Sequence, residues 1–468
     1  MLFPTFGFAL FFLCVFFGHW ITLRQPLARK WLLLIASYWF YAAWDWRFCS
    51  LLFLSSVVNY AAGVAIRNVA SAQGRNLALA LCVVANLGVL AFFKYYGFFI
   101  ESVAETLGAL GWQRDLPFLD IVLPVGISFF TFQGISYAVD TYRGRLAQAP
   151  SLLDVLLYIS FFPQLVAGPI VRAAHFLPQL RAAPAMDAYT AFGLLLIVWG
   201  LFKKVVVATY LAQEIVDPVF FDPLAYASVD VLLAVYGYAI QIYCDFSAYS
   251  DIAIGVAALL GFQFPRNFDQ PYRANSLREF WRRWHISLST WLRDYLYIPL
   301  GGARNGAWRT YRNLILTMLA GGFWHGAAWQ FIAWGAWHGG GLALERALRG
   351  LKLSWLQGLP GGLRIVLVFH FVCAGWVLFR AESFATAMDV FRSMFALATP
   401  STLVTPFVLG LLLIGLLMHF TPPRLLGCAE RVFARFPVVI QGLIAGVAVV
   451  FVDALGIEGV APFIYFQF

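Results

Sequence analysis

The chain has 468 residues, of which 62% are hydrophobic, 18% aromatic and 12% charged, and its formal net charge is +9. Soluble domains contain roughly 45–50% apolar and about 25% charged residues, so this composition excludes a water-soluble protein. The apolar runs are continuous rather than alternating, which favours membrane-spanning helices over a β-barrel. We therefore predict an all-α, polytopic integral membrane protein that forms a single membrane domain over residues 1–468.

A transmembrane helix needs about 20 apolar residues, and shorter apolar segments fit re-entrant or interfacial pieces. On this criterion we expect about eleven full crossings, with further re-entrant and horizontal helices around a central tunnel. The candidate segments are Phe3–Leu23, Trp31–Trp44, Phe48–Ile66, Leu77–Ile100, Leu119–Tyr137, Tyr189–Leu211, Val229–Tyr243, Asn313–Phe331, Trp334–Leu348, Gly362–Phe379, Leu403–Phe420 and Pro437–Val452.

Basic residues mark the loops next to the first and last of these segments, at Arg24–Lys30 and Arg424–Arg435. Cytoplasmic loops carry an excess of lysine and arginine, so both loops are expected in the cytoplasm and both termini outside, in the periplasm. The six cysteines are scattered and form no Cys-x-x-Cys pair. They fit small buried side chains, and we predict neither a disulfide framework nor a metal site.

Two prolines and a glycine interrupt the apolar segment Ser151–Pro178, at Pro163 and at Gly168-Pro169. Proline removes a backbone donor and clashes with the preceding turn of a helix. The backbone groups that this frees must face protein or a water-filled cavity. We predict a re-entrant element that lines a cavity, with a kinked span as the alternative.

The segment Val235–Leu260 carries too many polar side chains for a span that faces lipid, among them Asp245, Ser247 and Asp251. A buried hydrogen-bonded network that holds helices together explains them at least as well as a catalytic site does. We expect Asp245 and Asp251 to pair with arginines from the basic segment that follows.

That basic segment holds nine arginines and only three acidic residues between Arg266 and Arg312. Aromatic residues recur in it at helical spacing from Trp281 to Tyr295, which predicts one amphipathic helix within Pro265–Leu300. Such a helix fits the cytoplasmic interface or the wall of a funnel. Its arginines suit a ligand that carries phosphates, because the guanidinium fork matches phosphate geometry, although anionic lipid head groups would also satisfy them.

Two histidines follow, each between glycines: Gly322 and Gly326 bracket His325, and Gly335 and Gly339 bracket His338. Gly-x-x-x-Gly spacing lets neighbouring helices approach closely. The histidines are 13 positions apart. On a continuous helix they would point in different directions, whereas a break near Gln330–Ala333 would let them share a site.

A neutral imidazole in a dry site is a natural general base near pH 7, since its unperturbed pKa is about 6.5. It could remove the proton from an acceptor hydroxyl while that oxygen attacks an activated acyl group. A buried histidine is also a common core residue, so spacing alone leaves this choice open. The chain contains no Gly-x-Ser-x-Gly, Gly-x-x-x-x-Gly-Lys, Gly-x-Gly-x-x-Gly or His-Glu-x-x-His motif, which argues against the common hydrolases, nucleotide-binding enzymes and zinc proteases.

Four sequence blocks resemble one enzyme family. The run Trp284–Gly302 resembles the hallmark block of the membrane-bound O-acyltransferases, and Gly321–Trp329 resembles the block that holds their active-site histidine. The blocks Gln241–Ala253 and Pro462–Phe468 are similar to the bacterial branch that acetylates alginate and related exopolysaccharides. The likeness extends over nearly the whole chain, with 241–341 as the catalytic core stretch.

The resemblance implies that His325 is the catalytic histidine in a tunnel through the membrane, and that His285 is a second important polar residue, acting either in the chemistry or in the hydrogen bonds of the tunnel. It implies acetyl-CoA as the acyl donor, entering from the cytoplasm, and no bound cofactor. The acetyl group would reach a polysaccharide on the periplasmic side of the bacterial inner membrane, through periplasmic partner proteins. No role carries over to His338, for which packing is expected.

The remaining candidates complete the predicted site. Donor-binding candidates are Arg282, Arg283, Trp284 and Trp324, and candidates for a polar network in the tunnel are Asp245, Ser247, Asp251 and Ser289. Two alternatives stay open at this point. The same fold could transfer D-alanine to teichoic acid from a carrier-protein thioester, or the chain could be a transporter or polymer-export subunit with broken helices around an ion site.

Overall fold

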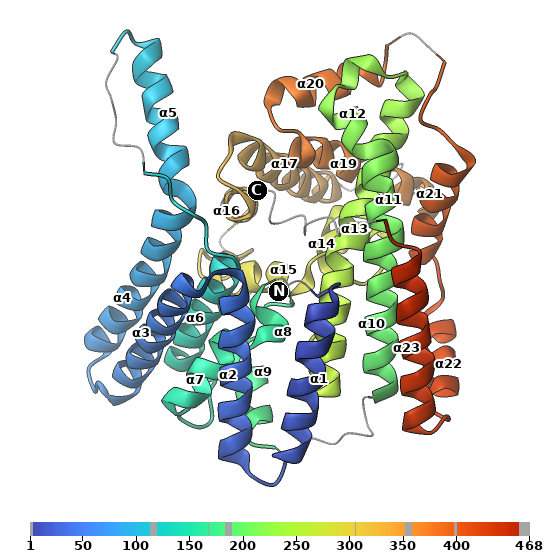
Figure 1. Ribbon diagram of the computed structural model, residues 1–468. Coiled ribbons are helices and arrows are strands. Elements are labelled where there is room, and N and C mark those ends of the chain that lie inside the picture. The colour runs from blue at the N-terminus through green and yellow to red at the C-terminus, as the bar shows by residue number, and fades with distance from the viewer. Residues whose placement is uncertain are drawn as a thin grey trace. The chain divides into compact units, whose positions relative to one another are not determined.

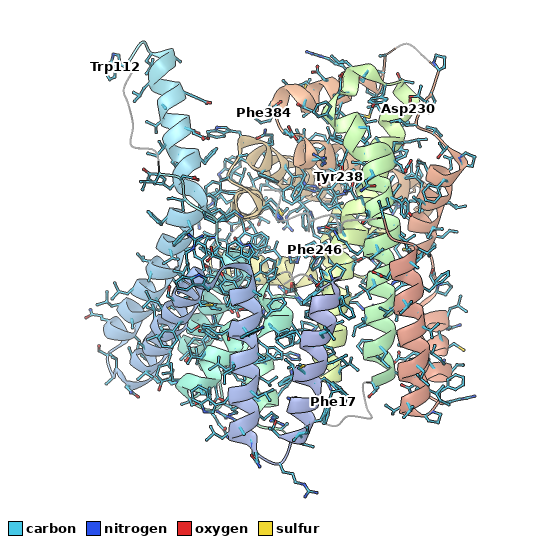
Figure 2. The ribbon with its side chains drawn as sticks, viewed as in Figure 1. Phe17, Trp112, Asp230, Tyr238, Phe246 and Phe384 are labelled. Carbon is cyan, nitrogen blue, oxygen red and sulfur yellow. The ribbon has the colours of Figure 1, made fainter. Side chains whose placement is uncertain are left out.

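The computed structural model describes residues 3–112, 119–166, 168–182, 190–304, 306–351, 358–396 and 400–457, without the side chains of Pro423 and Leu426. These residues form helices and connecting loops, with no β-strand among them, which confirms the all-α class (Figure 1). The block Pro462–Phe468 lies outside the described residues. The chain divides into two compact units: unit 1 holds 1–188, 257–264 and 326–328, and unit 2 holds 189–256, 265–325 and 329–468.

Several helical stretches in the described ranges are long and apolar enough to cross a membrane. Five qualify by length and composition: Pro26–Asn68, Ala72–Ala109, Thr190–Phe221, Ser228–Leu259 and Gly361–Arg380. Shorter apolar helices are Phe6–Ile21, Pro406–Met418 and Val438–Ala454. These stretches agree with a polytopic membrane protein, while the expected number of about eleven crossings stays a prediction.

Unit 1 is a helical bundle held together by small residues and paired amides. Its helices are α1 (Phe6–Ile21), α2 (Pro26–Asp45), α3 (Cys49–Asn68), α4 (Ala72–Leu90), α5 (Tyr96–Ala109), α6 (Ile127–Tyr142), α7 (Leu152–Ser160), α8 (Phe162–Leu165) and α9 (Ala173–Phe176). Asn59 of α3 and Asn86 of α4 donate hydrogen bonds to each other's amide oxygens, at 3.2 and 3.1 Å. Gly134 of α6 lies directly against Asn59. Buried polar pairs and small residues are what hold helices together where lipid provides no hydrophobic driving force between them.

The predicted break in Ser151–Pro178 is present, because α7 ends at Ser160 and a new short helix starts at Phe162. The freed backbone groups find partners inside the protein. Ser37 Oγ accepts from the backbone N–H of Phe162 at 3.2 Å, and the Gln164 side chain donates to the carbonyl oxygen of Tyr158 at 2.6 Å. Residues 154–165, on both sides of the break, are buried, as an irregular backbone in a membrane protein must be. Its re-entry into the bilayer stays a prediction.

Unit 2 contains His285, His325 and His338 and the basic segment between Arg266 and Arg312. Its helices are α10 (Thr190–Phe202), η4 (Lys203–Ala208), α11 (Thr209–Leu211), η5 (Ala212–Val216), α12 (Asp217–Phe221), most of α13 (Ser228–Leu259), α14 (Leu277–Arg283), α15 (Ile286–Leu292), η8 (Arg293–Tyr297), α16 (Ala307–His325), α17 (Trp329–Gly350), α19 (Gly361–Arg380), α20 (Phe384–Ser393), α21 (Pro406–Met418), α22 (Pro423–Phe433) and α23 (Val438–Ala454). Helix α23 packs along α10 (Figure 1). The segments η4, η5 and η8 are π-helical.

The prediction of a single amphipathic helix within Pro265–Leu300 was wrong. The chain leaves the helix after Arg283, and a second helix, α15, begins at Ile286. At the break His285 has a φ of 41°, in the left-handed region that residues other than glycine seldom adopt. Asn267 holds this turn, because its backbone oxygen accepts from the N–H of Ile286 at 2.8 Å and its side-chain oxygen accepts from the N–H of Ser287 at 3.1 Å.

Glycines allow α16 and α17 to pack closely against each other. Gly322 of α16 faces Gly335 of α17, and a Cβ on Gly322 would overlap the carbonyl oxygen of Phe331. Gly339 lies against the backbone of Ile315 in the same way. The prediction of close helix approach is therefore confirmed at these positions. The break between the two helices comes at 326–328, directly after His325 and before the predicted position.

Candidate active site

A cavity of about 960 Å³ lies within unit 2, with walls from α14, α15, η8, α16 and α17. Its buried side chains include Leu288, Leu292, Met318, His325 and Trp334. Its exposed side chains are mostly charged, and they include the arginines Arg278, Arg282, Arg293, Arg346 and Arg349. The cavity thus connects a basic mouth to a buried imidazole.

His325 is the last residue of α16 and is only 4% exposed. Three aromatic rings surround its imidazole, with ring centroids 5.0 Å away for Trp324, 5.1 Å for Trp334 and 5.2 Å for Phe379. The carbonyl groups at the C-terminal end of a helix carry a partial negative charge. This end of α16 therefore favours a positive charge on the imidazole, which burial among aromatic rings opposes.

His285 is fully buried and is not among the residues that line the cavity. Its Nδ1 lies 3.2 Å from the side-chain oxygen of Asn267. Since that oxygen can only accept, the Nδ1 atom carries the proton, and Nε2 is left with a lone pair that meets no donor in the described ranges. Burial lowers the pKa of His285, which lies outside the candidate spans, to about 3, so this imidazole is neutral at physiological pH.

Trp324 separates the two histidines. Its ring centroid lies 5.0 Å from that of His325 and 6.1 Å from that of His285. The structure therefore brings both predicted histidines to one region, but in contact with the same indole rather than with each other. The sequence reasoning missed Asn267, which holds His285 through the contact just described. A lone asparagine after Pro265-Arg266 has no periodicity or motif that could have identified it.

The two adjacent arginines have different environments. Arg282 is exposed and lines the cavity, whereas Arg283 is bonded inside unit 2. The Arg283 guanidinium donates to Glu279 Oε1 at 2.7 and 2.9 Å and to the backbone oxygen of Asp269 at 3.1 Å. Of the four predicted donor-binding residues, the structure places only Arg282 on the cavity wall. Trp284 packs instead against the rings of Phe280 and Trp376.

Two further arginines at the cavity were not among the named donor-binding candidates, although Arg278 belongs to the basic segment predicted to suit phosphates. Arg278 and Arg346 are exposed and line the cavity beside Arg282. None of these three has an ion-pair partner in the described part of the chain, while Arg293 pairs with Asp294 and Arg349 with Glu345. Arg346 was missed because it lies on α17, far along the chain from the basic segment. The mouth of the cavity therefore carries three positive charges that no carboxylate among the described residues neutralises.

Comparison with known proteins agrees with this geometry. A family model described as the membrane-bound O-acyltransferase family matches residues 136–358, which include both histidine blocks. The chain is 44% identical over 402 residues to a probable alginate O-acetylase AlgI from Azotobacter vinelandii, covering 85% of this chain and 78% of that protein. It is 38% identical over 427 residues to a peptidoglycan O-acetyltransferase from Helicobacter pylori, covering 84% and 79% respectively.

The chain belongs to the membrane-bound O-acyltransferase family. It is therefore an O-acyltransferase, and the transporter alternative falls away. A teichoic acid D-alanyltransferase from Bacillus subtilis is also related, at 30% identity over 321 residues that cover 62% of this chain and 79% of that protein.

In this acyltransferase the predicted polar network divides between two places. Ser289 lines the cavity, and its hydroxyl donates to the backbone oxygen of Trp284 at 3.1 Å. Asp245, Ser247 and Asp251 lie on α13 and are not among the residues that line the cavity.

The expected pairing of the α13 acids with arginines was wrong. Asp245 pairs with Lys204, and Asp251 pairs with Lys203 at 2.6 Å, while Ser247 accepts from Lys203 at 2.7 Å. Both lysines are almost fully buried in the π-helical segment η4. Since the acids and lysines come from two different helical segments, the network ties α13 to η4, which is the structural role that the sequence left open.

His338 does not line the acyltransferase cavity and packs among aromatic rings. Its ring centroid is 4.9 Å from that of Trp334 and 5.1 Å from that of Trp281. Trp334 therefore has His325 on one side and His338 on another, and the two imidazoles do not form one site. Packing, the expected role of His338, agrees with these contacts.

Proposed function

We propose that this acyltransferase moves an acetyl group from cytoplasmic acetyl-CoA to an acceptor hydroxyl, for O-acetylation of alginate or a related exopolysaccharide at the bacterial inner membrane. The observation that carries the proposal is the cavity, which joins three unpaired arginines at its mouth to the buried imidazole of His325. A donor with phosphates at one end and a thioester at the other matches this arrangement, with its phosphates at the arginines and its thioester at His325.

The mouth suits the phosphate groups of coenzyme A. Arg278, Arg282 and Arg346 are exposed, lack carboxylate partners in the described residues and can each present a planar fork to a phosphate. The inner walls, with Leu288, Leu292 and Met318, suit the less polar arm that carries the thioester. A donor bound in this direction brings its acyl carbon toward His325.

His325 acts in this proposal as the general base. It takes the proton of the acceptor hydroxyl as that oxygen forms a bond to the thioester carbon, and the C–S bond then breaks. The proton passes from the imidazolium to the departing sulfur, so coenzyme A leaves as a thiol and the acetyl group leaves as an ester. The C-terminal end of α16 favours the transient positive charge on the imidazole.

His285 has a supporting role in this proposal. Its neutral ring, held by Asn267, packs near Trp324, and Trp324 in turn contacts His325. The ring therefore helps to hold the indole that forms one wall around the catalytic imidazole. The acceptor reaches His325 from the periplasmic side, where partner proteins carry the acetyl group to sugar hydroxyls and where both chain termini are expected.

Transfer of D-alanine from a carrier-protein thioester is the second candidate. The O-acetylating relatives match this chain at 44% and 38% identity over 85% and 84% of its length, against 30% over 62% for the D-alanyltransferase. The unpaired arginines also favour a donor with several phosphates over the single phosphate that joins a thioester arm to a carrier protein. Both observations support acetyl transfer. The alginate O-acetylase is more similar to this chain than the peptidoglycan O-acetyltransferase is, which favours alginate or a related exopolysaccharide as the acceptor.

The test replaces His325 with alanine. We predict that His325→Ala keeps expression and membrane insertion but lowers acetyl transfer by on the order of 10² to 10⁴, the usual contribution of a general base. The measurement is the acetyl content of the secreted polymer, together with thiol release from acetyl-CoA in inverted membrane vesicles. His370→Ala, an exposed histidine of α19 away from the cavity, is the control that should keep normal transfer. Near-normal acetylation in the His325 variant would refute the assignment.

A further inference from the structure

Trp334 forms the wall of the cavity next to His325 and has a buried polar group without a partner. Its side chain is 1% exposed, and its indole Nε1–H donates to no hydrogen-bond acceptor in the ranges that the structure describes. Buried tryptophan N–H groups usually find an acceptor, because leaving a donor unpaired away from water is unfavourable. A buried, unpaired donor that lines a reaction cavity therefore calls for a functional explanation.

The position of this donor fits the charge that develops during acyl transfer. The Trp334 ring lies 5.1 Å from the His325 ring, nearly perpendicular to it, and both residues line the same end of the cavity. A small acyl group that has its attacking hydroxyl at the imidazole must lie beside this indole. Trp281 also has an unpaired Nε1–H at the cavity, but its nearest histidine ring is His338, one ring further from the reacting carbon.

We propose that the Trp334 Nε1–H donates a hydrogen bond to the carbonyl oxygen of the acyl donor and stabilises its negative charge in the transition state. This inference rests on the proposed function, in which His325 activates the acceptor hydroxyl. As the hydroxyl oxygen bonds to the thioester carbon, the π electrons of the C=O bond move to the carbonyl oxygen. They return when the C–S bond breaks, and the sulfur leaves with the proton that His325 received. A neutral donor fixed in a dry site is effective for this purpose because it needs no reorientation during the reaction.

The packing around Trp334 supports this role. Its ring contacts those of Trp281 at 5.6 Å, Trp376 at 6.0 Å and Phe379 at 5.4 Å, so it has little freedom to turn. Gly335, the next residue, lies against the backbone of Met318 in α16, which holds this part of α17 close to the helix that carries His325. The donor and the base are thus fixed relative to each other by one helix pair.

The test removes the N–H and keeps an aromatic side chain at position 334. In full-length protein in inverted membrane vesicles, with acetyl-CoA as the donor and thiol release as the signal, we expect Trp334→Phe to lower kcat by on the order of 10²-fold, as for the loss of one oxyanion donor. The KM for acetyl-CoA should change little, because the hydrogen bond forms mainly in the transition state. Replacing Trp334 with benzothienylalanine, which has the shape of tryptophan but sulfur in place of N–H, should give the same loss.

Trp337→Phe is the matched control. Trp337 lies on the same helix, and its N–H donates to the backbone oxygen of Phe371 at 3.0 Å, away from the cavity. This variant should keep the normal kcat although it loses a real hydrogen bond. Normal kcat in both Trp334 variants, with transfer abolished by His325→Ala, would overturn this inference alone. If His325→Ala kept normal thiol release, the proposed function would fail first.

Discussion

Arg282 and Arg283 are neighbours in sequence with opposite surroundings, and replacing each with glutamine separates donor binding from folding. Arg282 is exposed at the mouth of the cavity and has no carboxylate partner in the described ranges. A hydrogen bond to a charged group contributes about 1.5–3 kcal/mol, and an exposed site belongs at the lower end. A loss of about 1.5 kcal/mol raises the KM for acetyl-CoA by roughly tenfold, since 1.4 kcal/mol corresponds to a factor of ten.

Arg283 should behave in the opposite way. Its side chain is 22% exposed and bonds to Glu279 and to the backbone of Asp269. Removing it leaves the Glu279 carboxylate without its cation. It also removes the hydrogen bond to the backbone oxygen of Asp269, in the loop that precedes α14. We expect Arg283→Gln to lower the free energy of unfolding by about 1–3 kcal/mol, the range for a hydrogen-bonded charge that loses its partner. The KM of the protein that remains folded should be nearly unchanged.

The assay measures thiol release against acetyl-CoA concentration in inverted vesicles, and thermal unfolding of the purified protein in detergent. Arg309→Gln removes one exposed charge near the start of α16 that does not line the cavity, and it controls for the general loss of positive charge. An unchanged KM in Arg282→Gln, or an equal rise in Arg309→Gln, would contradict a direct phosphate contact. Arg282 would then serve anionic lipid or membrane topology instead.

Two further substitutions test the scaffold. Gly322→Ala places a methyl group against the carbonyl oxygen of Phe331, so α16 and α17 must separate. We expect the free energy of unfolding to fall by about 1–3 kcal/mol and acetyl transfer to decrease. The control is Gly340→Ala, whose methyl group meets open space and should change neither quantity. Lys204→Met leaves the buried Asp245 carboxylate without its cation and should cost about 3–5 kcal/mol, and adding Asp245→Asn should restore most of that loss in a double-mutant cycle.

The fold class and several local features of this protein can be predicted from its sequence. Composition and continuous apolar runs predict a helical membrane protein, and the glycines around His325 and His338 predict closely packed helices, which Gly322 and Gly339 confirm. The break near Pro163 follows from proline chemistry and is present. These successes share one property: each depends on local features, namely side-chain polarity, a missing backbone donor or a missing Cβ.

The errors come from contacts between segments that are distant in sequence. The aromatic spacing from Trp281 to Tyr295 is helical throughout, so nothing local indicates the break at His285. The break is held by Asn267, which lies 18 positions earlier and captures two backbone N–H groups. In the same way, the cations that meet Asp245 and Asp251 come from η4. Local periodicity could not have selected two lysines in an apolar run over nine nearby arginines.

The break after His325 also has a chemical consequence that a continuous helix would not provide. In the proposed mechanism His325 must gain a positive charge and lose it again in each cycle, and burial among three aromatic rings makes that charge unfavourable. In the middle of a helix the backbone carbonyls are paired and offer no compensation. At the last residue of α16 the negative end of the helix dipole favours the charge. The aromatic enclosure can therefore exclude water from the thioester while the helix end keeps the imidazolium accessible during turnover.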